Sequence, residues 1–121
     1  MATERYEALH AKYLRDGEKL LAEGDYVQAS EKYWGAVAQM IKMVAASRGL
    51  RHSSHPALRE VIQTVYRDTE DGEFVSLMRS AERLHVNFYE NDLDPETVLL
   101  HSKEALELVS KLRTLVPGVQ A

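Results

Sequence analysis

Hydrophobic residues recur every three or four positions along most of the chain, which is the spacing of one face of an α-helix. The first such stretch predicts a helix over residues 3–23, which Gly24 ends. The second predicts a helix over residues 25–48, between Asp25 as its N-cap and Gly49 as its end. No stretch has the period-two alternation of a half-buried strand.

Three further helices are predicted in the second half of the chain. A short one begins at Ser54 or His55 and is broken by the polar stretch 68–72. A longer one occupies residues 73–90, and Asp94, followed by a proline, caps the last helix. Four long amphipathic helices, one short helix and short loops favour an all-α fold, an up-down four-helix bundle with one additional short helix.

A length of 121 residues suits one domain with a single core. We assign residues 3–115 to the bundle and residues 116–121 to a flexible tail. The second helix has more Tyr and Trp than one bundle is expected to bury. A homodimer is therefore predicted, because a second copy would cover the surplus aromatic surface.

Composition narrows the class of protein. There are no cysteines, so disulfides and thiolate chemistry are excluded. The N-terminal residues lack the apolar core of a signal peptide, and no apolar run approaches the roughly 20 residues of a membrane span. We therefore expect a cytoplasmic protein with no membrane partner. The net charge of −4 argues against a protein that coats nucleic acid.

One stretch of the chain, residues 42–67, is basic against this acidic background. Its candidate ligands for a nucleotide or RNA phosphate are Arg48, Arg51, Ser54 and Arg59. The free N–H groups at the start of the third helix would help them to bind an anion. No glycine-rich phosphate loop accompanies these residues. The alternative is a solvated face whose charge complements that of another subunit.

His85 falls on the apolar face of the helix predicted over residues 73–90. As a catalytic residue it would act as a general base near neutral pH. As a structural residue it would be a buried neutral imidazole, hydrogen-bonded to Glu82 or Tyr89. His101 lies on the apolar stripe of the following helix, and a buried polar network of all four side chains is predicted.

The loop histidines His52 and His55 have H-x-x-H spacing, which can bind a metal ion. Neither a thiolate nor an H-E-x-x-H helix accompanies them, and His55 also fits the start of a helix. No metal site and no cofactor are therefore predicted.

The segment G-D-Y-V-Q-A-S-E-K-Y-W-G-A, residues 24–36, resembles the second helix of a tetratricopeptide repeat. Such repeats need copies about 34 residues apart, and no copy follows at that distance. We interpret the segment as part of a closely packed helical hairpin, in which small alanines allow close approach and tyrosine fills the remaining gap. A tetratricopeptide-like scaffold for protein interaction is one alternative function.

Four segments resemble the archaeal PaREP family, and the resemblance covers roughly residues 5–115: E-G-D-Y-V-Q-A-S-E-K-Y-W-G-A-V-A-Q, R-G-L-R-H-S-S-H, A-E-R-L-H-V-N-F-Y-E and L-V-S-K-L. That family in turn resembles the HEPN superfamily of helical bundles. The resemblance implies an archaeal origin and a HEPN-like bundle that forms dimers. It also implies a role as a ribonuclease of a toxin–antitoxin pair or as an inactive partner of a nucleotidyltransferase.

HEPN ribonucleases have an arginine, four to six further residues and then a histidine, and Arg79 and His85 match this pattern. Six steps along a regular helix place these two side chains about 120° apart. They would converge only through a distortion or across a dimer interface. We therefore favour a non-catalytic module that binds a nucleotide, RNA or another protein and acts as a dimer. The alternative is a metal-independent ribonuclease that uses Arg79 and His85.

Overall fold

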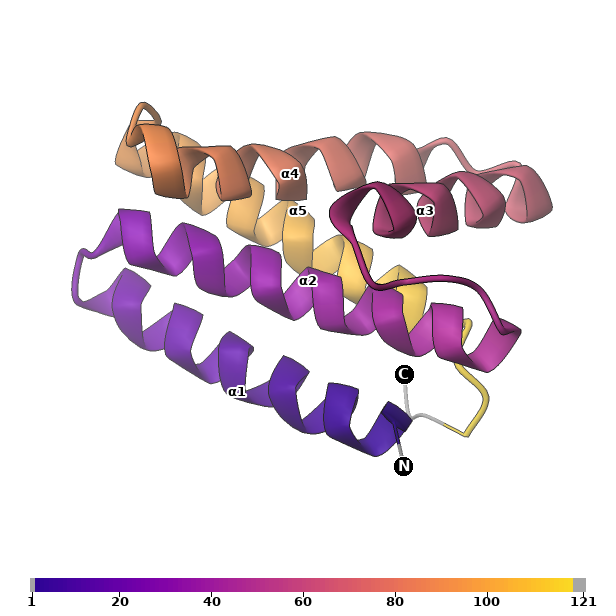
Figure 1. Cartoon of the computed structure of the whole chain (residues 1–121). Coiled ribbons are helices and arrows are strands. Elements are labelled where there is room, and N and C mark those ends of the chain that lie inside the picture. The colour runs from indigo at the N-terminus through magenta and orange to yellow at the C-terminus, as the bar shows by residue number, and fades with distance from the viewer. Residues whose placement is uncertain (1, 119–121) are drawn as a thin grey trace.

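The computed structural model describes residues 2–118, which are helical apart from the turns that join the helices and the residues 114–118 that follow the last one (Figure 1). The helices are α1 (Ala2–Ala22), α2 (Tyr26–Arg48), α3 (His55–Thr69), α4 (Glu73–Glu90) and α5 (Pro95–Arg113). No strand occurs in these residues. The predicted all-α class is thus confirmed, and the helix boundaries follow the predicted ones closely.

The four long helices form two hairpins, α1–α2 and α4–α5, and the shorter α3 lies against α2 and α4 (Figure 1). The second helix, α2, is the centre of the bundle because it packs against each of the other four. By contrast, α1 packs mainly on α2. The chain is therefore a packed helical bundle of four long helices with one additional short helix, as predicted.

Polar N-caps begin three of the helices. The side chains of Asp25, Ser54 and Asp94 each accept a hydrogen bond from the backbone N–H three residues further on, at 3.2, 3.2 and 2.7 Å. Such bonds satisfy donors that the first turn of a helix leaves free. At the other end of α2, Gly49 has a φ of 68°, a left-handed conformation that glycine adopts without strain.

Helices α1 and α2 pack closely because a glycine on each helix contacts a tyrosine ring on the other. A Cβ atom added to Gly17 would lie 2.9 Å from the ring of Tyr33, and one added to Gly35 would lie 3.1 Å from the ring of Tyr13. Either side chain would clash with the aromatic ring. The interpretation of residues 24–36 as part of a helical hairpin is confirmed, but the closest approach is made at glycines rather than at the expected alanines.

The aromatic residues of α2 are covered within one chain, contrary to the expectation on which the homodimer was based. Tyr33 and Trp34 are both buried in the main core cluster, and Tyr26 packs partly against it. The expectation was wrong because α2 is central and has neighbours on almost every side, whereas a helix at the edge of a bundle exposes one face. The aromatic residues of α2 therefore give no support for a homodimer.

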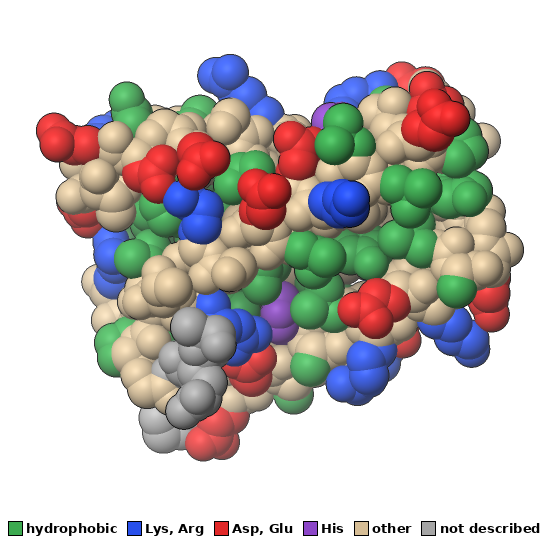
Figure 2. Space-filling view, turned by 180° about the vertical axis from the view of Figure 1, so that it is seen from behind, with side chains coloured by type: hydrophobic (Ala, Val, Ile, Leu, Met, Phe, Trp, Pro, Cys, Tyr) green, Lys and Arg blue, Asp and Glu red, His purple; other side chains and the backbone are tan. Residues whose placement is uncertain are grey.

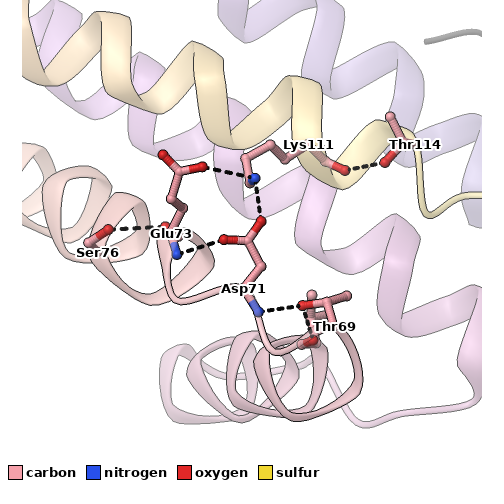
Figure 3. Close-up of polar contacts among 7 residues, drawn as sticks. Thr69, Asp71, Glu73, Ser76, Lys111 and Thr114 are labelled. Atoms are coloured by element: carbon pink, nitrogen blue, oxygen red, sulfur yellow. Dashed lines mark hydrogen bonds and ion pairs between the residues drawn. The ribbon is translucent and has the colours of Figure 1, made fainter.

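A polar cluster joins the turn between α3 and α4 to α5 (Figure 3). The Nζ atom of Lys111 lies 2.6 Å from a carboxylate oxygen of Asp71 and 3.2 Å from one of Glu73. The other carboxylate oxygen of Asp71 accepts from the backbone N–H of Glu73, and the hydroxyl of Thr69 accepts from the N–H of Asp71. These bonds lower the pKa of Asp71, chiefly through Lys111, and raise the pKa of Lys111.

The packed part of the chain extends past α5. Val116, the first residue of the predicted tail, is buried, and Leu115 packs against the core cluster. Residues 119–121 of that predicted tail lie outside the described residues. None of the helices in residues 2–118 is both long and apolar enough to cross a membrane.

Candidate functional site

His85 lies at the edge of the interface between α2 and α4, and its side chain is 25% exposed. Its Nδ1 atom is 2.9 Å from a carboxylate oxygen of Glu31 on α2. The apolar stripe of α4 runs through Ala81 and Leu84, which are fully buried. One residue further on, His85 is rotated by about 100° from Leu84. That rotation turns the imidazole out of the core towards Glu31.

A second histidine, His55, lies beside His85, with 5.7 Å between the ring centroids. It is the first residue of α3, where the N-cap Ser54 fixes the direction of the chain. The Nε2 atom of His55 lies 2.8 Å from a carboxylate oxygen of Glu82 on α4. Each imidazole is therefore oriented by its own carboxylate, from a different helix.

The indole of Trp34 packs against both imidazoles. Its ring centroid is 4.8 Å from that of His55 and 5.2 Å from that of His85, and the second pair is stacked. Trp34 itself is buried, so it forms a rigid wall behind the two histidines. We call Glu31, Trp34, His55, Glu82 and His85 the histidine cluster.

Each imidazole of the histidine cluster has one nitrogen with no hydrogen-bond partner in residues 2–118, namely Nδ1 of His55 and Nε2 of His85. Neither atom is among the fully buried polar atoms that lack a partner, so both are partly accessible to solvent. Because the opposite nitrogen donates its proton to a carboxylate, the solvent-facing nitrogen of a neutral ring is an acceptor. The cluster thus presents two bases to solvent, side by side.

Arg79 and His85, the predicted catalytic pair, are not joined. Arg79 is exposed and lines a small groove between α3 and α4 together with Glu82, whereas His85 turns towards α2. No hydrogen bond or ring contact links the two side chains anywhere in the described part of the chain. The helix is regular here, so the angular separation expected from the sequence is retained.

The predicted buried network of Glu82, His85, Tyr89 and His101 is wrong. Glu82 binds His55, and His101 binds Glu104 of its own helix at 2.8 Å. Tyr89 is 70% exposed, and only the edge of its ring touches His85, at 5.3 Å between centroids. The prediction failed because side chains at the rim of α4 and α5 reach solvent or a neighbour on the same helix more easily than the core.

The buried polar link between helices is made instead by Asn87. Its side-chain NH2 donates to the hydroxyl of Ser30 on α2 at 3.0 Å, and both residues are fully buried. Its carbonyl oxygen accepts from the backbone N–H groups of Asp92 and Leu93, at 3.0 and 2.9 Å. The sequence held one signal for this role, since Asn87 follows Leu84 at the spacing of the apolar stripe.

The four predicted phosphate ligands do not converge on one site. The guanidinium of Arg48 forms an ion pair with Asp68 at 2.9 Å, and that of Arg59 binds Glu82 at 2.8 Å. Arg51 lines a separate groove between the end of α2 and α3. The hydroxyl of Ser54 serves as the N-cap of α3. Local carboxylates therefore already neutralise two of the three arginines.

A groove of about 420 Å³ opens on the exposed side of α2 and meets the histidine cluster, with which it shares Glu31 and Trp34. Its remaining lining residues are Tyr13, Gln28, Lys32, Gly35, Gln39 and Phe88. Gln39 is only 8% exposed, and its side-chain carbonyl oxygen has no hydrogen-bond partner among residues 2–118. Most buried polar groups in proteins have a partner. This groove was not found by sequence reasoning, because its walls come from three separate helices.

The histidines of the H-x-x-H loop have separate partners. His52 contacts the hydroxyl of Tyr6 at 2.9 Å and the carbonyl oxygen of Leu50 at 2.8 Å, whereas His55 belongs to the histidine cluster. Within residues 2–118, no group of three or more His, Asp or Glu side chains is arranged to hold a metal ion.

The fold and the site describe a small all-α bundle with a polar cluster and an open groove on one side of its central helix. The chain belongs to the archaeal PaREP1/PaREP8 family, whose sequence profile matches residues 5–109. It is also similar to a Sulfolobus solfataricus protein of known crystal structure, with 25% identity and a TM-score of 0.78. That match covers 88% of this chain and 95% of the other. No curated protein is significantly similar to this chain.

Proposed function

We propose that the chain is a non-catalytic module that binds a nucleotide or a short stretch of single-stranded RNA in the groove beside the histidine cluster. The observation that carries this proposal is the side chain of Gln39, which lines the groove and whose buried carbonyl oxygen has no hydrogen-bond partner in residues 2–118. Leaving such a group unsatisfied costs about 1–3 kcal/mol. A ligand that donates a hydrogen bond there would recover that cost.

The chemistry of the groove fits a flat heteroaromatic ring. Its walls include the aromatic rings of Tyr13, Trp34 and Phe88, and bases stack on such rings. An amide side chain can bind the hydrogen-bonding edge of a base. The phosphate would then extend over the histidine cluster towards Arg79, which is exposed and has no ion-pair partner in the described part of the chain.

Fluorescence titration with a single-stranded oligoribonucleotide tests the proposal directly, because Trp34 is the only tryptophan of the chain. We expect RNA to change its emission, and Gln39→Leu to weaken binding about 3- to 10-fold through the loss of one hydrogen bond. Ser110→Ala on α5, an exposed position outside this groove and the groove of Arg79, is the control and should bind as the wild type does. Equal affinity of the Gln39 variant and the wild type would refute the base-binding role of the groove.

A second candidate function is a metal-independent ribonuclease, and the pair of solvent-facing imidazoles favours it. One neutral imidazole would take the proton of a ribose 2′-hydroxyl, whose oxygen attacks the phosphorus and forms a 2′,3′-cyclic phosphate. The other imidazole, when protonated, would give its proton to the departing 5′-oxygen. Acid–base catalysis by a side chain contributes roughly 10²–10⁴-fold to a rate. In this proposal His55, rather than Arg79, is the residue that acts together with His85.

RNA cleavage in the presence of a chelator separates these functions. If the enzyme proposal is right, His55→Asn and His85→Asn should each reduce cleavage by about 100-fold or more. His101→Asn, the same change on α5, is the control and should cleave normally. Loss of cleavage in Arg79→Ala but not in His55→Asn would restore the original Arg79 and His85 pair. RNA binding without cleavage would leave the non-catalytic module.

We further propose that the bundle is HEPN-like and that it acts beside a nucleotidyltransferase. The support is the PaREP family, which the L-H-V-N-F-Y-E segment resembles and which in turn resembles the HEPN superfamily, together with the all-α architecture. Co-expression with a nucleotidyltransferase of the same genome tests the partnership. A complex that co-elutes in size-exclusion chromatography would support it, and separate elution of the two proteins would count against it.

A further inference from the structure

The exposed face of α5 carries three leucines on one side of the helix. Leu99, Leu100 and Leu106 are 45%, 56% and 38% exposed. All three line a groove of about 410 Å³ between α5 and the hairpin of α1 and α2, where Leu21 and Tyr33 also contribute. Seen from behind the molecule, hydrophobic side chains gather on the half of this face that carries the α1–α2 turn, with charged side chains beside them (Figure 2).

The charged residues on this face are arranged so that two antiparallel copies of the same helix would place opposite charges against each other. Glu96 and Lys103 flank the leucines symmetrically, in the order Glu96, Leu99, Leu100, Lys103. Both side chains line the same groove, both are exposed, and neither has an ion-pair partner in residues 2–118. A negative charge therefore lies one helical turn before the leucine pair, and a positive charge lies one turn after it.

We propose that α5 is the interface of a homodimer, in which two copies of the helix pack antiparallel about a two-fold axis between Leu99 and Leu100. This arrangement places Leu99 of one chain opposite Leu100 of the other. It also places Glu96 opposite Lys103 of the second copy, twice over by symmetry. A two-fold interface has to be complementary to itself, and this order of residues has that property.

Leu106, which lines the same groove, extends the apolar surface towards the C-terminal half of α5. Ser102, which lines the groove, is buried and its hydroxyl has no partner in the described residues. The interface is independent of the histidine cluster, because it lies on α5 and uses none of the cluster's residues.

Charge reversal tests the register, with mass measured by light scattering after size-exclusion chromatography. The wild type should have the mass of two chains. Glu96→Lys and Lys103→Glu should each shift towards the mass of one chain, because like charges then face each other at both ends. Mixing the two single variants should restore the two-chain mass, since each lysine of one then meets a glutamate of the other. The double variant should also dimerise by itself.

Two further variants keep the test decisive. Leu100→Asp should give a folded single chain, with an unchanged circular dichroism spectrum, since the side chain is exposed in the monomer. Glu60→Lys, a charge reversal on α3, should leave the dimer intact. A single-chain mass for the wild type at the highest attainable concentration would overturn the proposal. So would single variants that stay dimeric, or single variants that fail to pair when mixed.

Discussion

Two polar clusters hold the short helix α3, one at each end. At its C-terminal end, Asp71 and Lys111 belong to a cluster in which each carboxylate oxygen of Asp71 has a partner. At its N-terminal end, the histidine cluster leaves a nitrogen of His55 and one of His85 open to solvent. The first cluster is complete without any other molecule. The second has capacity to bind, which is why we place the ligand there.

Asn87 is a polar side chain that is both buried and fully hydrogen-bonded. Its replacement should therefore have the largest effect on the free energy of unfolding. Asn87→Ala removes the bond to Ser30 and two acceptor contacts of the α4–α5 turn. We expect the free energy of unfolding to fall by about 2–4 kcal/mol, measured by urea denaturation. Ser30→Ala should cost less, because Asn87 keeps its turn contacts. A loss below that of Ser30→Ala would contradict this account.

Lys111→Met tests the complete cluster and should lower the melting temperature by a few degrees, an effect that high salt reduces. The pKa of Asp71 is lowered in the folded chain, so its contribution to stability is present above its ordinary pKa. That contribution is lost as the pH falls through the lowered value. The difference between the variant and the wild type should therefore shrink in acid.

The control for this prediction is Lys19→Met, which removes an exposed lysine with no ion-pair partner in residues 2–118. Its melting temperature should follow that of the wild type at every pH. A Lys111→Met difference that grows in acid would show that Asp71 is not the group responsible.

Gln39→Leu tests the groove beside the histidine cluster, and it should raise stability where the other variants lower it. The variant replaces a buried carbonyl oxygen that lacks a partner in the described residues with an apolar group. We expect the free protein to gain about 1 kcal/mol of stability in urea denaturation. Gln63→Leu on α3 should change it little. Destabilisation by Gln39→Leu would indicate that the amide has a structural role and would weaken the ligand proposal.

His85→Asn should have the smallest effect on stability, below about 1 kcal/mol, because both side chains of this pair are partly exposed and Glu31 can bind water instead. His10 provides the contrast. It is buried, its Nδ1 lies 2.8 Å from the carbonyl oxygen of Ala36, and burial lowers its pKa. His10→Asn should cost about 1–3 kcal/mol in the same assay. Equal losses for the two variants would make His85 a structural residue.

The titration of His10 should also make the free energy of unfolding of the wild type depend on pH. Its pKa is lower in the folded chain than its ordinary value of 6.5, so the unfolded chain binds a proton more readily. The contribution of His10 to stability is therefore fully present above the ordinary pKa of 6.5. It falls as the pH drops from 6.5 towards the lower pKa of the folded chain. Urea denaturation at a series of pH values should show this slope in the wild type and not in His10→Asn.

Most of the fold could be predicted from the sequence because its signals are local. The N-caps Asp25, Ser54 and Asp94 and the C-terminal Gly49 lie within a few residues of the helix ends that they define. Periodicity then identifies the buried face of each helix. The same periodicity could not show that α2 is central. The sequence therefore did not predict that Tyr33 and Trp34 are buried within a single chain.

The site was less predictable because its contacts join residues that are far apart in the chain. His85 was singled out by its place on α4, but its partner Glu31 lies 54 positions earlier. His55 had a sufficient local role at the start of a helix, so nothing in the sequence connected it with His85. Only the packing of α3 against α4 brings these two imidazoles together.

The light attachment of α3 has a consequence for motion. This helix has the sparsest packing of the five, and apart from a short apolar face it is held by the two polar clusters at its ends. Weakly packed elements open as units before the whole protein unfolds. Amide hydrogens of α3 should therefore exchange with solvent sooner than those of α2. Each opening would carry His55 away from His85, so a ligand bound across both histidines should slow exchange along the whole of α3.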